Sequence, residues 1–311
     1  MNTRLLPRFP IDNAFSAVII KQQSINLSPT IMKFYRHWIK CTRDIIQPGT
    51  NGKTFPMSVY GHSNISLEDA KDSGQRLLDS FAKRLVFHLS PWEYDNDGRP
   101  IREETLLELS PRNIVTRNRY GAEVLNSTQL VFIDVDGDLP SYGGLFGWIM
   151  DLFLKTPSQD KESEELAKVA KLAAKAGHAM THIRVYRTKA GYRLMLLNCD
   201  TEGKYSRELM KAFYADPIYA DLCRVQNCYR ARLTPKPHRI RQRKCHFNYP
   251  ETDAEVLETQ QKWLEEYNAK IANFATCRYI GSLNGPNGIA ANEAARYHDE
   301  RTNAMSNLPL A

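Results

Sequence analysis

A short apolar run that leads into alternating acids stands near the middle of the chain. Residues 130–133 are all apolar, and Asp134, Asp136 and Asp138 follow at every second position. A run of this length and composition is typical of a buried strand. Because alternate residues of a strand share a face, Asp134 and Asp136 are predicted to point the same way. Asp138 joins them if Gly137 does not turn the chain first.

Alternating apolar positions predict further strands on both sides of this run. Residues 182–187 and 192–197 alternate around a Thr-Lys-Ala-Gly turn and predict a hairpin beside the acidic strand in one sheet. Two short strands are expected within residues 114–125, around an Arg-Asn-Arg-Tyr-Gly turn. Residues 55–60 also read as a strand, and residues 281–288 as a loop rich in Gly, Asn and Pro.

Helical spacing of apolar residues covers much of the remaining chain. The predicted helices span residues 30–46, 66–87, 100–109, 145–153, 161–175, 206–214, 216–225, 252–278 and 290–304. The resulting fold class is α/β (α+β), with a mixed or antiparallel central sheet that carries the Asp-x-Asp strand and is flanked by helices. We expect a mainly helical region over 1–110, an α/β core over 111–250 and a helical region over 251–311, all within one compact unit.

Composition and charge narrow the classes of partner. The chain has 311 residues, a formal net charge of +7 and a pI near 9.0, which is compatible with an anionic partner. No apolar run is long enough to cross a membrane, and residues 1–8 lack the apolar core of a signal peptide. Six scattered cysteines read as free thiols. We therefore expect a cytoplasmic protein without a membrane partner.

The acidic strand predicts a metal site. Carboxylates on one face repel each other unless a cation lies between them, and hard oxygen ligands favour Mg²⁺ or Mn²⁺. Asp134, Asp136 and Asp138 are the candidate ligands. The alternative is a strand that ends in a polar Asp-Gly turn.

Basic residues gather in two places. No acid lies between Asp221 and Glu251, and aromatic residues are interleaved there with many cations, a composition that suits a nucleic-acid backbone and its bases. The candidate nucleic-acid-binding residues are Arg230, Arg232, Lys236, Arg239, Arg241 and Arg243. Arg117 and Arg119 in the earlier turn are candidates for a phosphate contact. The alternatives are a basic surface that pairs with acids elsewhere and surface arginines on a hairpin.

The order of acidic strand, two helices, Thr-x-x-Gly hairpin and Arg-rich extended segment resembles archaeo-eukaryotic primases and primase-polymerases. In that superfamily an Asp-x-Asp pair binds two metals, and a Ser-x-His or Gly-x-His element on a later strand contacts the incoming nucleotide. Here Arg193 stands where histidine is expected. Asp216 and Asp221 are the candidates for a third acid.

This resemblance implies a metal-dependent nucleotidyltransferase-like protein. Its partners would be a nucleoside triphosphate and a nucleic acid, DNA rather than RNA. The implied catalytic residues are Asp134, Asp136 and Arg193. The implied nucleotide-binding residues are Thr188, Lys189, Gly191, Arg117 and Arg119.

Two other classes of function remain open. The segment from Asp134 to Leu139 also resembles the first motif of haloacid-dehalogenase-like phosphatases, which implies Asp134 as nucleophile and Asp136 as general acid. The third class is a non-catalytic DNA- or RNA-binding protein whose acids are structural.

Overall fold

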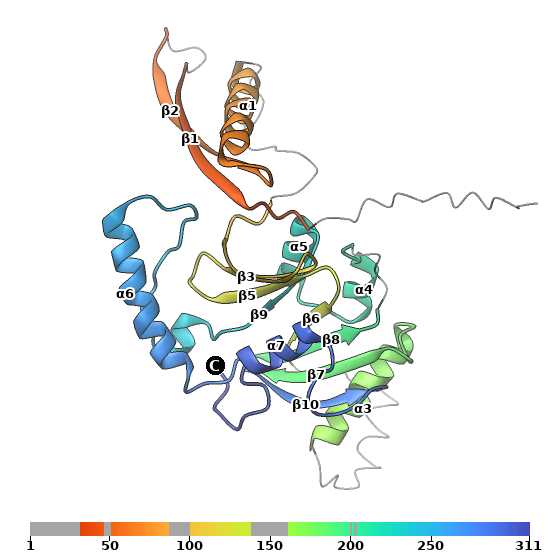
Figure 1. Cartoon of the computed structure of the whole chain (residues 1–311). Helices are drawn as coiled ribbons and strands as arrows, with labels where there is room; N and C mark the ends of the chain where they lie inside the picture. The colour runs from red at the N-terminus through yellow and green to blue at the C-terminus, as the bar shows by residue number, and fades with distance from the viewer. Residues whose placement is uncertain (1–31, 47–50, 87–99, 138–160, 200, 202–203) are drawn as a thin grey trace, which may run out of the picture.

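The computed structural model describes residues 32–46, 51–86, 100–137, 161–199, 201 and 204–311. Within these ranges the strands form three antiparallel sheets and the helices pack around them (Figure 1). The expected α+β class with antiparallel pairing is confirmed.

The first four-stranded sheet has the order β10–β7–β8–β6 and carries the acidic residues. Its strands are β6 (Val131–Asp136), β7 (His182–Thr188), β8 (Gly191–Leu197) and β10 (Cys277–Leu283). β7 and β8 form the expected hairpin, and β8 pairs directly with β6. Asp134 and Asp136 both belong to β6, so they lie two residues apart on one strand.

The second four-stranded sheet has the order β3–β4–β5–β9. It comprises β3 (Glu104–Ser110), β4 (Asn113–Arg117), β5 (Glu123–Ser127) and β9 (Tyr229–Arg232). β9 packs beside β6, which places the start of the basic segment next to the acidic strand.

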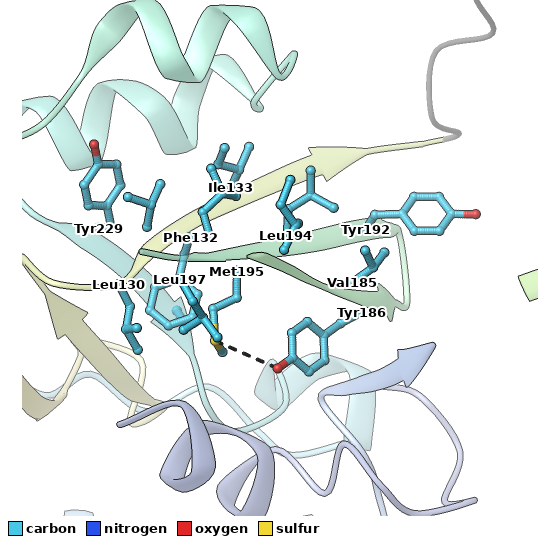
Figure 2. Close-up of a cluster of buried hydrophobic side chains, with 14 of the residues drawn as sticks. Leu130, Phe132, Ile133, Val185, Tyr186, Tyr192, Leu194, Met195, Leu197 and Tyr229 are labelled. Carbon is cyan, nitrogen blue, oxygen red and sulfur yellow. Dashed lines mark hydrogen bonds between the residues drawn. The ribbon is translucent and has the colours of Figure 1, made fainter. Parts of the chain in front are cut away.

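A shared apolar core joins the two larger sheets. Phe132, Ile133, Leu194 and Met195 come from neighbouring strands and are completely buried, as Figure 2 shows. Tyr186 of β7 lies in the same cluster, with its hydroxyl 3.9 Å from the sulfur of Met195. Burial of each such side chain contributes about 1.5–3 kcal/mol, so this core fixes the positions of β6 and β8.

Helices close the faces and ends of these sheets. α3 (Lys161–Lys175) packs near β10. α5 (Pro217–Gln226) follows α4 (Arg207–Ala212) and docks on β6, because the Tyr219 hydroxyl donates to the Phe132 carbonyl at 2.8 Å. The others are the 3₁₀ helix η1 (Pro237–Ile240), α6 (Ala254–Ile271) and α7 (Glu293–Arg301).

The N-terminal part forms a smaller unit with a core of its own. β1 (His37–Ile46) pairs with β2 (Thr54–Ser63), and α1 (Leu67–Val86) packs against both. The core of this unit includes Cys41, Val59, Leu78 and Phe81. Figure 1 shows the unit beside the two larger sheets.

Several predicted elements are wrong. The helix expected over 30–46 is replaced by strand β1 from His37 onward, and the helix over 100–109 is replaced by strand β3. The described part of residues 1–110 therefore holds three strands and one helix and is not mainly helical. In the C-terminal region α6 ends at Ile271, and β10 occupies residues predicted as helix end and loop.

The other helices agree with the sequence pattern. α1, α3, α4, α5, α6 and α7 each lie within a predicted range or within one or two residues of it. The predicted helix over 145–153 lies outside the described residues. All six cysteines are free thiols, as expected.

Candidate functional site

Asp134 is held by an arginine on the neighbouring strand. In the ladder between β6 and β8, Asp134 pairs with Arg193. Arg193 Nε donates to Asp134 Oδ1 at 2.7 Å, and Nη2 donates to Oδ2 at 3.1 Å. Both carboxylate oxygens are thus engaged by one guanidinium in the two-bonded geometry that favours arginine.

The Arg193 side chain is almost fully buried, at 4% exposure. Burial alone would lower the pKa of Arg193, but the charge and hydrogen bonds of Asp134 outweigh burial and raise it. The remaining nitrogen, Nη1, donates to the Arg232 carbonyl at 2.9 Å and lies 3.4 Å from His298 Nε2. The guanidinium is therefore a buried counter-ion of Asp134 whose three nitrogens all contact protein groups.

His298 extends this network into the core. Its Nδ1 lies 3.1 Å from Asp299 Oδ1, and Asp299 also pairs with Arg184 at 2.5 Å and accepts from the Tyr186 hydroxyl at 2.6 Å. Burial, together with the charge of Arg193, lowers the pKa of His298 despite the hydrogen bond with Asp299. A neutral His298 with its proton on Nδ1 fits these contacts.

Asp136, in contrast, is exposed at the end of β6. The chain turns directly after it, because Gly137 has a φ of +78° and its amide donates to the Ala190 carbonyl at 2.8 Å. This contact brings the β7–β8 turn, with Thr188 and the exposed Lys189, beside the acidic end of the strand. Asp138 lies outside the described residues.

The described acids do not fit the predicted pair of metal ions. Among the residues that the structure describes, no group of three His, Cys, Asp or Glu side chains is placed to hold a metal. Asp134 has both oxygens hydrogen-bonded to Arg193 and is partly buried, whereas Asp136 is exposed. Asp216 caps α5 by accepting from the Tyr219 amide, and Asp221 pairs with Arg224. The Mg²⁺ or Mn²⁺ site therefore stays a prediction.

A cationic pocket of ≈ 300 Å³ opens beside the acidic strand, and it is hereafter called the basic pocket. The side chains that line it include Asn118, Tyr120, Arg232, Lys236, His238 and Lys244. Within the described ranges, neither Arg232 nor Lys236 forms a salt bridge.

The lowered pKa values of Arg232 and Lys236 indicate an excess of positive charge in the basic pocket. Burial and the nearby charge of Arg193 lower the pKa of Arg232 to about 10. The pKa of Lys236 is also lowered, by burial and by the charges of Arg232 and Arg239, with only partial relief from Asp136 and Asp134. A bound anion would relieve this mutual repulsion.

The backbone that carries these cations is rigidly held. The Leu233 amide donates to the Glu123 carbonyl at 2.8 Å, and the Glu123 amide donates to Thr234 Oγ1 at 2.9 Å. The buried Tyr267 hydroxyl is 2.9 Å from Thr234 Oγ1 and 2.6 Å from the Pro235 carbonyl. α6 and β5 therefore fix the chain on which Arg232 and Lys236 project, as a preorganised site requires.

The other predicted nucleic-acid-binding arginines divide into two groups. Arg230 is buried, donates to both carboxylate oxygens of Glu103 at 2.8 and 2.7 Å and also contacts Gln226. The prediction that Arg230 belongs to a binding surface is therefore wrong, because its charge is compensated inside the fold. Arg239 is half-buried, while Arg241 and Arg243 are exposed on the segment that follows η1.

The predicted nucleotide-binding residues are also separated by the fold. Arg117 pairs with Glu104 at 2.9 Å, whereas Arg119 is exposed with its guanidinium 5.3 Å from the ring centroid of Tyr120. The Arg119 carbonyl accepts from the Phe247 amide at 3.0 Å, so this turn lies against the basic segment. Asn118 and Tyr120, between and beside the two arginines, line the basic pocket and were not predicted.

Gly191 has a structural reason for being glycine. A Cβ atom at this position would lie 2.1 Å from the Val135 carbonyl oxygen. Close pairing of β8 with β6 near Asp136 therefore requires the absence of a side chain.

No helix among the described residues is long and apolar enough to cross a membrane.

Comparison of the chain with family models, with curated proteins and with solved structures finds no match.

Proposed function

We propose that this protein binds single-stranded nucleic acid, with a backbone phosphate in the basic pocket, and that it does so without a catalytic metal. The observation that carries the proposal is the charge imbalance between two neighbouring arginines. Arg193 is neutralised by Asp134, whereas Arg232 and Lys236 face the pocket with their charges uncompensated by any described acid at salt-bridge distance. Phosphate oxygens are the natural counter-ions for such a site.

The surroundings of the pocket favour a nucleic acid over a free phosphate. Tyr120 lines the pocket and is 50% exposed, and its ring centroid lies 6.3 Å from that of the exposed His246. Exposed aromatic rings beside a cationic groove offer stacking surfaces for unpaired bases. Arg119, Arg241 and Arg243 are also exposed and extend the positive surface beyond the pocket.

The Asp134–Arg193 pair favours binding over nucleotidyl transfer. In a two-metal mechanism the strand carboxylates must be free to hold the ions, but here a buried guanidinium occupies both oxygens of Asp134. The same contact ties up the carboxylate that a phosphatase would use as its nucleophile and so disfavours that role.

Fluorescence anisotropy with a labelled oligothymidylate tests this proposal. Lys236→Gln is expected to weaken binding and to reduce the slope of log K against log salt by about 1, because one phosphate contact is lost. Lys168→Gln on α3 removes the same charge from an exposed position outside the pocket and serves as the matched control. Equal affinities and slopes for the two variants would refute the proposal.

Binding to a duplex of the same length distinguishes the contribution of base stacking from that of charge attraction. Tyr120→Leu is expected to weaken the oligothymidylate and to leave the duplex unaffected, because paired bases are not available to the ring. A duplex that binds as tightly as the single strand would contradict the preference for unpaired nucleic acid.

A further inference from the structure

A second, larger cavity lies at the other end of the acidic strand, and it is hereafter called the distal cavity. Its volume is ≈ 490 Å³, and its wall includes Leu130, directly before β6, and Leu197, the last residue of β8. Asp136 pairs with Gly191 at the opposite end of the same ladder. The distal cavity therefore shares no lining residue with the basic pocket.

The charged side chains that line the distal cavity are all basic, and the thiol of Cys199 lies in the same wall. Arg112 comes from the β3–β4 turn, while His182 and Arg184 come from the start of β7. No carboxylate of the described part of the chain lines this cavity. Asp299 compensates Arg184 from behind the cavity wall, whereas Arg112 is exposed and forms no salt bridge with any described residue.

His182, which also lines the distal cavity, has a ring nitrogen without a hydrogen-bond partner among the described residues. This nitrogen is Nε2, and it is buried. Burial and the positive charge of Arg184 lower the pKa of His182. An anion in the distal cavity would supply a counter-charge for Arg112 and would favour the protonated form of His182.

Two further features define the kind of ligand. Asn292, the N-cap of α7, is in the wall, so the positive end of that helix faces the same space. Apolar surface is also present, since Leu130 and Leu197 lie in the wall together with Ile289, which is 79% exposed. Apolar walls with a few convergent polar groups are typical of small-molecule sites.

We propose that the distal cavity binds a small organic oxyanion, in which a carboxylate or phosphate group contacts Arg112 in the cavity that His182 also lines and an apolar portion packs on Leu130 and Leu197. This site is separate from the basic pocket and does not depend on nucleic-acid binding.

The test follows the titration of His182 by NMR, with ¹³C-labelled histidine in the full chain and His182→Gln to assign the resonance. Butyrate and inorganic phosphate are compared with chloride at equal ionic strength. Either probe is expected to raise the pKa of His182 by about one unit, as a nearby opposite charge does. A stronger effect of butyrate identifies a carboxylate ligand with an apolar tail, and a stronger effect of phosphate identifies a phosphate ester.

One test variant and two control variants assign the effect to the distal cavity. Arg112→Gln is expected to weaken the probe at least about tenfold, the loss of one charge-assisted hydrogen bond. Arg76→Gln, an exposed arginine on α1, and Lys236→Gln in the basic pocket should leave the His182 response unchanged. The proposal would be overturned if both probes left the pKa of His182 unchanged. It would also be overturned if Arg112→Gln and Arg76→Gln gave equal responses.

Discussion

Asp134 and Arg193 form a complete ion pair across two adjacent strands, and the arginine is the more deeply buried partner, at 4% exposure against 29%. Removing one member of such a pair leaves a buried charge without compensation, which is more costly than the pair itself is stabilising. The pair therefore stabilises the fold and neutralises the charge of Arg193 beside the basic pocket.

Asp134→Asn is expected to lower the free energy of unfolding by about 3 kcal/mol, because Arg193 would keep its charge in the core. Urea denaturation measures this change. Asp136→Asn is the matched control, since Asp136 is exposed, and it should change stability by less than about 0.5 kcal/mol. Equal effects of the two substitutions would contradict the structural role of the pair.

Removal of divalent metal should not affect oligonucleotide binding. Asp134 already has a cation bound to both of its oxygens, so binding at the basic pocket requires no Mg²⁺ or Mn²⁺. We expect the same dissociation constant in EDTA and in millimolar Mg²⁺ once ionic strength is matched. A metal-dependent increase in affinity that disappears in Asp136→Asn would instead support the predicted metal site.

Arg232→Gln should stabilise the free protein while weakening binding. The pKa of Arg232 is lowered to about 10, so the fold favours its neutral form, and holding the charge at pH 7 costs stability. This cost is fully present below pH 10 and fades as the pH rises from there toward the ordinary pKa of an arginine side chain. We expect a gain of about 1 kcal/mol after solvent screening, measured by urea denaturation at pH 7, together with weaker oligothymidylate binding.

The converse result for Arg232→Gln would be informative. Loss of stability without loss of binding would assign Arg232 a purely structural role.

His298 should make the protein sensitive to acid. Its pKa is lowered in the fold, so below the unfolded value of 6.5 the unfolded chain binds a proton that the folded chain does not. Stability is unaffected above that pH and falls below it, by up to about 1.4 kcal/mol per pH unit until the folded pKa is reached. Comparison of the wild type with His298→Gln at pH 7 and pH 5 isolates this contribution, because His62 and His182 remain in both proteins. A constant difference between the two proteins at both pH values would show that His298 does not titrate differently on folding.

Gly191→Ala should destabilise the strand pair next to the acidic end. The added methyl would lie 2.1 Å from the Val135 carbonyl oxygen, and overpacking of this kind costs about 3 kcal/mol. Gly52→Ala provides the comparison, since Gly52 has a φ of +82° with open space around it and should cost only about 1 kcal/mol. If Gly191→Ala folded as stably as Gly52→Ala, another role for this glycine would have to be sought.

Local sequence patterns predicted most of the helices and the strands of the acidic sheet except β10. β1 was mistaken for a helix because the aromatic residues Phe34, Tyr35 and Trp38 fall at i, i+1 and i+4, a helical spacing. Trp38 breaks the strand alternation because it packs on Tyr35 and His62. β10 was missed because its register shifts between Tyr279 and Gly281, so its burial does not alternate.

The candidate site could be predicted only in part, since its chemistry depends on long-range register. The sequence places Asp134 at a strand end, but the pairing of β6 with β8 sets Arg193 opposite it, 59 residues along the chain. Arg230 and Arg232 look equivalent in sequence, yet Glu103 neutralises Arg230 and leaves Arg232 for the basic pocket. No local pattern distinguishes the two arginines.

The way in which the N-terminal unit is attached has a consequence for how the molecule is assembled. Phe34 and Ile101 form a parallel bridge, and the Ile101 amide donates to the Lys33 carbonyl at 2.8 Å. The chain therefore leaves the main body and returns to it at adjacent points, and the β1–β2–α1 unit is inserted between them with a separate core. In evolutionary terms such a unit can be lengthened, exchanged or lost while both cavities of the main body stay intact.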